Sequence, residues 1–455
     1  MIKLNQISFG YNQDEKFLDK IDFEIPENKF ITIIGQSGSG KTTLAKLIAG
    51  ILSPGNGKIT VDGYDFTGQK PAYIGKNSDY NSIFTTTLEE LTAFGPENSG
   101  IPGEEISARI IQSLKITGLE KFRFFPVHAL SRGQKQIAAL ASFLTLKPKY
   151  LVLDEPTSLL DEIDEKKFWE IVKTIHKSYK IGIIYFSNGI FVPGCDSLFY
   201  IKNKKIEEIK TDSAILSEKI PVNTSQIADD SSIVLEIKNA GYSPDKNIFN
   251  KGNLILKNVN LKISKGEFVF IYGNSGSGKS TLAKLIANLI KPSFGEVNFP
   301  SFSSKKNTKS FRQKIGLIFQ EPENQFLTEN IGQEINFGLA NFNVPEKESI
   351  ERTEWIFGLL SLNYDYLKNQ DMLYFPLAGK RKIAAASALV LFPEILVIDD
   401  ILTGLDIEEK NALLKAFIEY QKRTNCACLF FTGRKSDIIS REHFYVLNEG
   451  NLIYK

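Results

Sequence analysis

The sequence contains few cysteines. Only three occur among 455 residues, Cys195, Cys426 and Cys428. Three cysteines are too few for a disulfide framework, and no second pair at zinc-ligand spacing accompanies the Cys-x-Cys pair. We therefore expect a reducing, cytoplasmic environment without a structural zinc.

The sequence also lacks an apolar run long enough to cross a membrane. The apolar, uncharged stretch at residues 383–393 falls short of the roughly 20 apolar residues that a spanning helix needs. The first residues show no apolar core of a secretory signal. We expect any membrane role to come through partner subunits.

Neither sign of charge dominates the chain. With 55 basic and 53 acidic residues the net charge is +2, so no general field for nucleic acid is expected. The basic cluster at residues 380–382 is interpreted as a solvated helix face. The hydrophobic content of 42% is that of a globular protein, and the length suits two domains of roughly 200 to 230 residues.

A phosphate-binding loop occurs twice, at residues 35–42 (GQSGSGKT) and 273–280 (GNSGSGKS). Both match G-x-x-x-x-G-K-[ST] between an apolar strand-like run and a helical pattern, the context that this motif needs. The glycines let backbone N–H groups close around a polyphosphate, the lysine neutralises phosphate oxygens, and the hydroxyl completes an Mg²⁺ shell. The predicted nucleotide-binding residues are Gly35, Gly38, Gly40, Lys41, Thr42 and Thr43 in the first copy and Gly273, Gly276, Gly278, Lys279, Ser280 and Thr281 in the second.

The repeat extends beyond the loops. The separation of matching residues grows from 231 positions between Tyr11 and Tyr242 to 245 positions between Asp154 and Asp399. This slow drift indicates two duplicated domains rather than short repeats. We predict a first domain at residues 1–210, a linker at 211–233 and a second domain at 234–455. Strands and helices alternate in each half, which predicts an α/β fold: two P-loop NTPase domains, each with a mixed sheet and an inserted helical subdomain.

In each half an apolar strand ends in two acids, Asp154 and Glu155 or Asp399 and Asp400. Phosphoryl transfer needs positioning and charge stabilisation, so the first acid can hold Mg²⁺ while the second orients the attacking water. We predict that Glu155 and Asp400 are catalytic. The predicted Mg²⁺ ligands are Thr42, Asp154, Ser280 and Asp399.

Residues 130–136 (LSRGQKQ) and 158–161 (SLLD) closely resemble the signature motif and D-loop of ABC-type ATPases, and the resemblance covers essentially the whole chain. In that family two nucleotide-binding domains pack head to tail, and each ATP lies between one domain's phosphate loop and the other's signature. The residues that the resemblance assigns to ATP are Ser131, Gly133 and Gln134 in the signature, with Tyr11 and Tyr242 stacking on adenine. A tyrosine at a strand edge that has only a structural role is nearly as common as one that stacks on adenine.

A finer resemblance comes from residues 88–98 (LEELTAFGPEN) and 320–327 (QEPENQFL), which look like the energy-coupling factor (ECF) ATPases. That family drives uptake of vitamins and transition-metal ions with a membrane T-component and a substrate-binding S-component. The resemblance implies both partners and a peripheral location at the cytoplasmic face of the cell membrane. It also implies that Gln320 is a further Mg²⁺ ligand, which senses Mg²⁺ and the membrane partner.

Two positions near the expected γ-phosphate depart from the family pattern. Lys76 stands where the first half should carry the glutamine that matches Gln320. Asn188 and Gly433 stand where the family has a histidine. The three histidines of the chain lie elsewhere and are interpreted as structural or surface residues: His128, His176 and His443.

The second half has also lost its signature, which reads FPLAG at residues 375–379. Pro376 offers neither a hydroxyl nor an N–H group to a phosphate. Asp400 is one methylene shorter than glutamate, and a misplacement of about 1 Å can lower a rate roughly 10²-fold. Head-to-tail pairing would then give two unlike sites. We predict that the Glu155 site performs most of the hydrolysis while the Lys279 site, closed by the intact signature, holds ATP for long periods.

The leading functional hypothesis is the ATP-hydrolysing component of an ECF-type importer. The tandem ATPase of a sugar importer is a close alternative. A soluble tandem ABC protein acting on the ribosome is another, although such proteins usually carry a long charged linker and residues 211–233 form a short segment with few charged residues. A nucleotide-gated switch with little turnover is the last.

Overall fold

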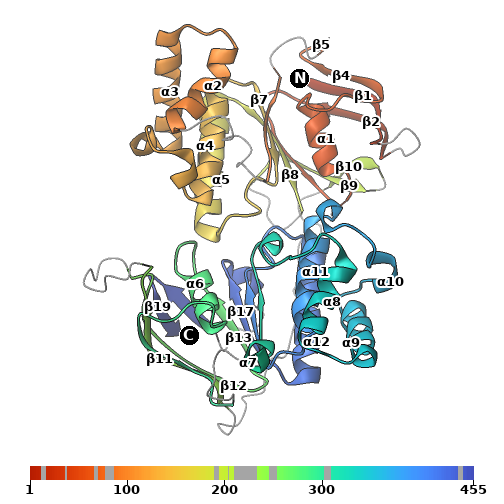
Figure 1. Cartoon of the computed structure of the whole chain (residues 1–455). Helices are drawn as coiled ribbons and strands as arrows, with labels where there is room; N and C mark the ends of the chain where they lie inside the picture. The colour runs from red at the N-terminus through yellow and green to blue at the C-terminus, as the bar shows by residue number, and fades with distance from the viewer. Residues whose placement is uncertain are drawn as a thin grey trace. The chain divides into compact units, whose positions relative to one another are not determined.

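The chain divides into two compact units, Met1–Glu218 and Lys219–Lys455 (Figure 1). The computed structural model describes residues 1–11, 17–35, 38–65, 70–76, 87–188, 194–202, 204–209, 233–244, 254–301, 309–438 and 444–455. The predicted linker, residues 211–233, lies outside the described residues except for Ile233, which begins β11.

The first unit contains an antiparallel sheet of order β2-β1-β4-β5 and a six-stranded sheet of order β10-β9-β3-β8-β7-β6. In the larger sheet, neighbours from β9 to β6 pair in parallel and only β10 runs antiparallel to its neighbour. The mixed sheet predicted for this half is confirmed. The strands are β1 (Ile2–Phe9), β2 (Leu18–Ile25), β3 (Phe30–Ile34), β4 (Asn56–Val61), β5 (Tyr64–Asp65), β6 (Ala72–Ile74), β7 (Tyr150–Asp154), β8 (Gly182–Ser187), β9 (Ser197–Lys202) and β10 (Lys205–Ile209).

A helical subdomain is inserted between β6 and β7, as predicted. Its three α-helices pack on one another at one side of the unit, and the antiparallel sheet lies at the other side (Figure 1). The helices of this unit are α1 (Lys41–Ile48), α2 (Leu88–Asn98), α3 (Gly103–Thr117), α4 (Arg132–Leu144) and α5 (Glu162–Tyr179), with short 3₁₀ turns at Glu120–Phe122 and Val127–Ala129.

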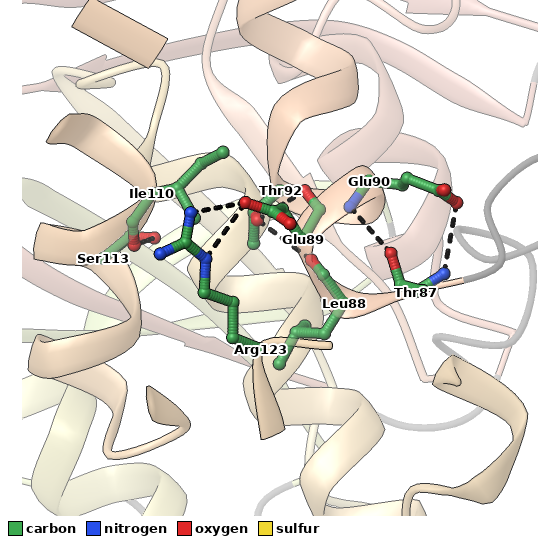
Figure 2. Close-up of polar contacts among 8 residues, drawn as sticks. All are labelled: Thr87, Leu88, Glu89, Glu90, Thr92, Ile110, Ser113 and Arg123. Atoms are coloured by element: carbon green, nitrogen blue, oxygen red, sulfur yellow. Dashed lines mark hydrogen bonds and ion pairs between the residues drawn. The ribbon is translucent and has the colours of Figure 1, made fainter. Parts of the chain in front are cut away.

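Side-chain caps fix the start of α2. The Thr87 hydroxyl accepts a hydrogen bond from the N–H of Glu90 at 3.3 Å, and the Thr87 N–H donates to the Glu90 carboxylate at 3.2 Å. The Arg123 guanidinium, from the turn that precedes α4, donates to Glu89 at 3.0 and 2.5 Å (Figure 2). A capping box of this kind contributes about 1 kcal/mol. The segment at 88–98 is thus a helix anchored at its first turn.

The six-stranded sheet separates two apolar clusters. Side chains alternate along β7: Leu151 and Leu153 face the cluster beneath the helical subdomain and α5, whereas Tyr150 and Val152 face the cluster beneath α1 and the antiparallel sheet. Because both faces of the sheet are covered, β7 is buried along its whole length and mostly apolar. Its acid, Asp154, is the last residue of the strand.

The second unit repeats this architecture. Its sheets have the orders β12-β11-β14 and β15-β16-β17-β13-β18-β19. The strands are β11 (Ile233–Tyr242), β12 (Leu256–Ser264), β13 (Phe268–Tyr272), β14 (Phe294–Asn298), β15 (Ile315–Ile318), β16 (Ile395–Asp399), β17 (Ala427–Thr432), β18 (Phe444–Asn448) and β19 (Asn451–Tyr454). The α-helices are α6 (Lys279–Ile286), α7 (Lys309–Gln313), α8 (Ile331–Asn341), α9 (Glu346–Leu359), α10 (Tyr364–Leu367), α11 (Leu377–Leu389) and α12 (Ile407–Thr424). Helices α4 and α11 both have 13 residues, and α5 and α12 both have 18, so the duplication holds element by element.

Candidate functional site

Each phosphate loop joins a buried parallel strand to a helix, β3 to α1 in the first unit and β13 to α6 in the second. The glycine before each helix has a left-handed backbone, with φ of 98° at Gly40 and 102° at Gly278, a conformation that residues with a Cβ rarely adopt. These glycines let the chain turn sharply into the helix. Residues 36 and 37 of the first loop lie outside the described residues.

The loop lysines are buried and point back into their own loops. Lys41 Nζ donates to the Gly35 carbonyl at 2.6 Å. Lys279 Nζ donates to the Gly273 and Asn274 carbonyls at 2.6 and 3.0 Å. Both ammonium groups therefore lie inside the loop, where the motif requires positive charge for a polyphosphate.

The predicted acid pairs lie at the carboxyl ends of β7 and β16, and all four acids are buried. The second acid of each pair has a left-handed backbone, with φ of 48° at Glu155 and 47° at Asp400. A non-glycine residue in this region costs on the order of 1 kcal/mol or more, and such strain concentrates at functional turns. Both units keep the turn and thereby aim the second carboxylate in the same way.

In the first unit two donors hold Glu155. The Lys76 ammonium lies 2.7 Å from Glu155 Oε2, and the Asn188 amide donates to the same oxygen at 2.9 Å. Strand register explains the first contact: Ile74 of β6 pairs with Leu153 of β7, so two residues further on Lys76 lies beside Glu155. The lysine that replaces the expected glutamine is thus an ion-pair partner of the predicted base.

In the second unit uncharged donors hold Asp400. The register of β15 on β16 brings Gln320 to Asp400, and its Nε2 donates to Oδ2 at 3.3 Å. The Thr403 hydroxyl donates to Oδ1 at 2.7 Å, and the backbone N–H of Gly433 donates to the same carboxylate. Gly433 therefore supplies a backbone donor at the position where a histidine was expected.

Burial favours the protonated forms of Glu155, Asp399 and Asp400. It raises the pKa of Glu155, while the charges of Lys76 and Lys41 oppose the shift. It raises the pKa of Asp399 to about 6 despite a hydrogen bond from Ser280. Burial also raises the pKa of Asp400, against a hydrogen bond from Thr403. The charged forms of these carboxylates are stabilised incompletely by the protein alone.

The residues fit a magnesium ion. One buried oxygen of Asp154 and one of Asp399, Oδ1 in each case, make no hydrogen bond within the described part of the chain. A buried carboxylate oxygen without a donor suits Mg²⁺ or a water bound to it, because Mg²⁺ takes few protein ligands and completes its shell with water and phosphate oxygens. Thr42 and Ser280 begin the helices that follow the loops, and Ser280 already donates to Asp399.

The two signature positions differ in how their helices begin. Ser131 caps α4 by accepting from the N–H of Gln134 at 3.2 Å, and the Gln134 side chain accepts from the N–H of Ser131 at 2.8 Å. Gly133 is needed because a Cβ there would lie 2.2 Å from Asp164 of α5. In the second unit Pro376 occupies the cap position and makes no such hydrogen bond. Contact of Ser131, Gly133 and Gln134 with nucleotide of the other unit remains a prediction.

The two predicted adenine-stacking tyrosines have different surroundings. Tyr11 is 62% exposed, and its hydroxyl lies 2.9 Å from the Thr43 hydroxyl at the start of α1. Its ring meets Phe9 and Phe17 edge-on at centroid distances of 5.0 and 5.8 Å. Tyr242 is half-buried against the core beneath α6. An exposed ring beside the loop helix fits the predicted role better at Tyr11 than at Tyr242.

Sequence reasoning missed two side chains of the site. The Tyr73 hydroxyl donates to Asp154 Oδ2 at 2.9 Å, and its strand-register counterpart in the second unit is the apolar Leu317. Thr403 donates to Asp400 as described above. Neither residue belongs to a motif, and only the position of Tyr73 one residue before the end of a strand could have drawn attention to it.

The remaining predictions concern histidines and membrane spans. His176 shares a hydrogen bond with the Ile181 carbonyl at 2.9 Å and meets Phe30 edge-on, which is a structural environment. His128 is exposed, and His443 lies outside the described residues. Within the described ranges, no helix combines the length and the apolar character needed to cross a lipid bilayer.

Comparison with known proteins identifies the family. The ABC transporter family profile matches residues 18–158 and 256–403, together more than half of the chain. A protein of Methanosarcina acetivorans is 30% identical over 449 residues, covering 93% of this chain and 84% of its own length. One of Caldanaerobacter subterraneus is 28% identical over 488 residues, with coverages of 93% and 85%. Both carry the provisional name of ABC transporter ATP-binding protein.

Among solved structures, cbiO1 of Clostridium perfringens, described as part of the ABC transporter complex cbiONQ, is 28% identical with a TM-score of 0.43, covering 49% of this chain and 87% of its own. The chain therefore belongs to the ABC transporter family, as an ATP-binding component with two P-loop domains.

Proposed function

We propose that this protein hydrolyses ATP at sites built on its two phosphate loops and couples the reaction to uptake through membrane partners of the energy-coupling factor type. One observation carries the proposal: the same arrangement recurs in both units. In each, three groups lie at the carboxyl ends of parallel strands: a buried loop lysine, an aspartate oxygen that accepts no hydrogen bond from the described residues, and a second carboxylate held by neighbouring donors. Ligand sites of α/β sheets lie at this edge.

The residues have distinct tasks in hydrolysis. Lys41 and Lys279 would hold the phosphates by charge, together with the backbone N–H groups of the loops. Thr42 and Asp154 would hold Mg²⁺ in the first unit, and Ser280 and Asp399 would hold it in the second. When bound, Mg²⁺ would neutralise charge that develops on the phosphates. Glu155 or Asp400 would orient the attacking water and accept its proton.

We propose further that the two sites are unequal. Glu155 is longer than Asp400 by one methylene and would reach further toward the water, whereas the intact signature at Ser131 would close on nucleotide held by Lys279 if the units pair head to tail. A Glu155→Gln variant should lose most of the phosphate release, by about 10²-fold or more, and Asp400→Asn should lose less. Full turnover in Glu155→Gln would contradict this assignment.

The importer type rests on two segments that resemble ECF ATPases. Residues 88–98 form α2 with its capped first turn. The segment after Gln320 is fastened to α11, the helix at the second signature position: Gln325 Nε2 donates to the Ala384 carbonyl and the Ser387 hydroxyl, both at 2.8 Å. A second tie joins Glu323 to Lys380 at 3.0 Å. A T-component that pressed on this segment would therefore act directly on α11.

The decisive experiment is steady-state phosphate release by the purified protein, with and without co-purified membrane subunits. Wild type is compared with Lys41→Ala and Lys279→Ala. Turnover that rises with a membrane subunit and falls mainly in Lys41→Ala supports the proposed coupling to a membrane partner. The cargo would be a vitamin, metal ion or similar small molecule that an S-component selects. Turnover that is indifferent to every membrane subunit would argue against an importer.

A nucleotide-gated switch is the second candidate function. The Lys76 ion pair with Glu155 favours it, because a base that is already paired with an ammonium group is less free to accept a proton from water. Pro376 at the second signature position favours it as well. This candidate predicts tight ATP binding with almost no phosphate release. Recovery with ribosomes instead of membranes would favour the soluble tandem class.

A further inference from the structure

The two sites differ in charge at the end where Mg²⁺ would bind. In the first unit the described charged groups that act on Glu155 are Lys76, Lys41 and Asp154. In the second unit the charges of Lys279 and Lys284 act on Asp399, the charge of Lys279 acts on Asp400, and the nearby Asp437 is paired with Lys410 at 3.0 Å. Among the described residues, the first site therefore has an ammonium group in contact with its second acid, whereas the second site has neutral donors in contact with its second acid.

The difference arises at one register-equivalent position. Lys76 and Gln320 both follow their strand by two residues, and both donate to the second acid of the pair. Lysine brings a full charge to this place, and its side chain is 40% exposed, so the ammonium can move between Glu155 and a nearby anion. Glutamine offers only a neutral amide to the same place.

We propose that Lys76 is a built-in cation at the magnesium end of the first site. The first unit then binds nucleotide with little dependence on Mg²⁺, and the second unit binds it as the Mg²⁺ complex. The inference rests on the proposed function, since it assumes that both loops take nucleoside triphosphate. An ammonium group beside the phosphates supplies attraction that Mg²⁺ would otherwise supply, and it repels a divalent cation. In the second site the neutral Gln320 amide supplies no such charge, so attraction for the phosphates at this end has to come from Mg²⁺.

The test is binding of a fluorescent ATP analogue to the full chain, with Mg²⁺ and with a chelator. Lys279→Ala leaves the first site and Lys41→Ala leaves the second. Removal of Mg²⁺ should weaken binding by less than about threefold in Lys279→Ala and by about tenfold or more in Lys41→Ala, since a partly buried charge pair is screened weakly.

Reciprocal exchange of the two residues sharpens the test. Lys76→Gln in the Lys279→Ala background should make binding dependent on Mg²⁺, and Gln320→Lys in the Lys41→Ala background should reduce that dependence. Lys115→Gln, at an exposed position of α3, removes one positive charge far from the loop motif in the sequence and should change neither.

The possible results distinguish the role of Lys76 from the ATPase proposal itself. Equal Mg²⁺ dependence of the two sites, or exchange variants that behave like their parents, overturns the role of Lys76 and leaves the ATPase proposal standing. No nucleotide binding by either site overturns both. If a loop variant fails to fold by circular dichroism, wild type provides the same comparison, because removal of Mg²⁺ should reduce bound nucleotide from two per chain to one.

Discussion

At the residue scale, the two presumed bases differ more in what holds them than in their own chemistry. Glu155 accepts from a lysine and an asparagine, whereas Asp400 accepts from a glutamine, a threonine and a backbone N–H group. A charged partner neutralises a carboxylate, whereas neutral donors stabilise its charge through hydrogen bonds without cancelling it. The same turn geometry can therefore serve unlike sites.

Asp399, the buried last residue of β16, should lower the free energy of unfolding of the second unit when no ligand is bound. Burial raises the pKa of Asp399 to about 6, so the folded state binds a proton more tightly than the unfolded state does. The free energy of unfolding should fall as pH rises from about 4 to about 6 and stay lower above that. Asp399→Asn should raise the stability of the second unit at pH 7 by about 1–3 kcal/mol.

Thermal unfolding of wild type and Asp399→Asn at several pH values checks this. The difference between them should shrink as the pH falls from about 6 to about 3 and vanish below that, where Asp399 is protonated in both states. Glu354→Gln is the control, because it removes the same negative charge from an exposed position on α9. Its stability should not differ from that of wild type in this pH-dependent way. A constant advantage of Asp399→Asn at all pH values would mean that burial of charge is not its cause.

At the element scale, the two signature helices show how a local change alters a site without changing the fold. Helices α4 and α11 have equal length and equivalent places in the chain, yet α4 begins with a capping box and α11 with proline. Proline at the cap position is tolerated because the first N–H groups of a helix have no partner within it. The second unit thus lacks the hydroxyl and the N–H group at this position but keeps the helix.

Gly133 tests the packing of α4 on α5. A methyl group there would lie 2.2 Å from a carboxylate oxygen of Asp164, so Gly133→Ala should destabilise the first unit by about 1–3 kcal/mol. Gly103→Ala is the matched control: no atom lies within 4 Å of the added methyl group at the start of α3, and alanine should be neutral or stabilising by up to about 1 kcal/mol. Denaturant unfolding of both variants gives the comparison, and equal stability of the two would refute the close approach.

A second packing difference separates the units. A surface pocket of about 250 Å³ in the first unit is lined by Arg109, Gln112 and Lys147, among others. In the second unit the repeat places Trp355 and Phe392 at the positions of Gln112 and Lys147, and their rings lie 5.3 Å apart. Arg352 there lies 4.6 Å above Phe392. Aromatic side chains thus fill a space that is open in the first unit.

Truncation of these residues should have unequal effects. Trp355 stacks on Tyr420 at 5.7 Å, so Trp355→Ala should cost the second unit about 2–4 kcal/mol. Gln112→Ala should change the first unit by less than about 0.5 kcal/mol, because Gln112 is exposed. Midpoints of urea unfolding measure both changes. A similar loss in both variants would show that the aromatic cluster contributes no special stability.

At the scale of the whole molecule, each unit has its own pair of apolar clusters and its own two sheets. A domain with a separate core can fold alone. We therefore expect the two units, produced as separate chains, to unfold cooperatively and to bind ATP. If they pair head to tail, each alone should release little phosphate, and mixing them should restore turnover as their concentration rises.

Sedimentation and phosphate release over a range of equimolar mixtures test this expectation. Turnover by the first unit alone, with no gain on mixing, would contradict the need for a composite site. A first unit that aggregates would point to stabilisation by the second.

The sequence by itself determined the duplication, the phosphate loops, the acid pairs and the family, because these depend on spacing along a few neighbouring residues. It also located the mixed sheets and the helical subdomains, whose apolar patterns are local. Strand register decided the rest. Lys76 and Glu155 are distant in the chain, and only the pairing of β6 with β7 brings the ammonium to the carboxylate. Tyr73 reaches Asp154 for the same reason. Partners across a sheet follow from long-range hydrogen bonding, which no local spacing encodes.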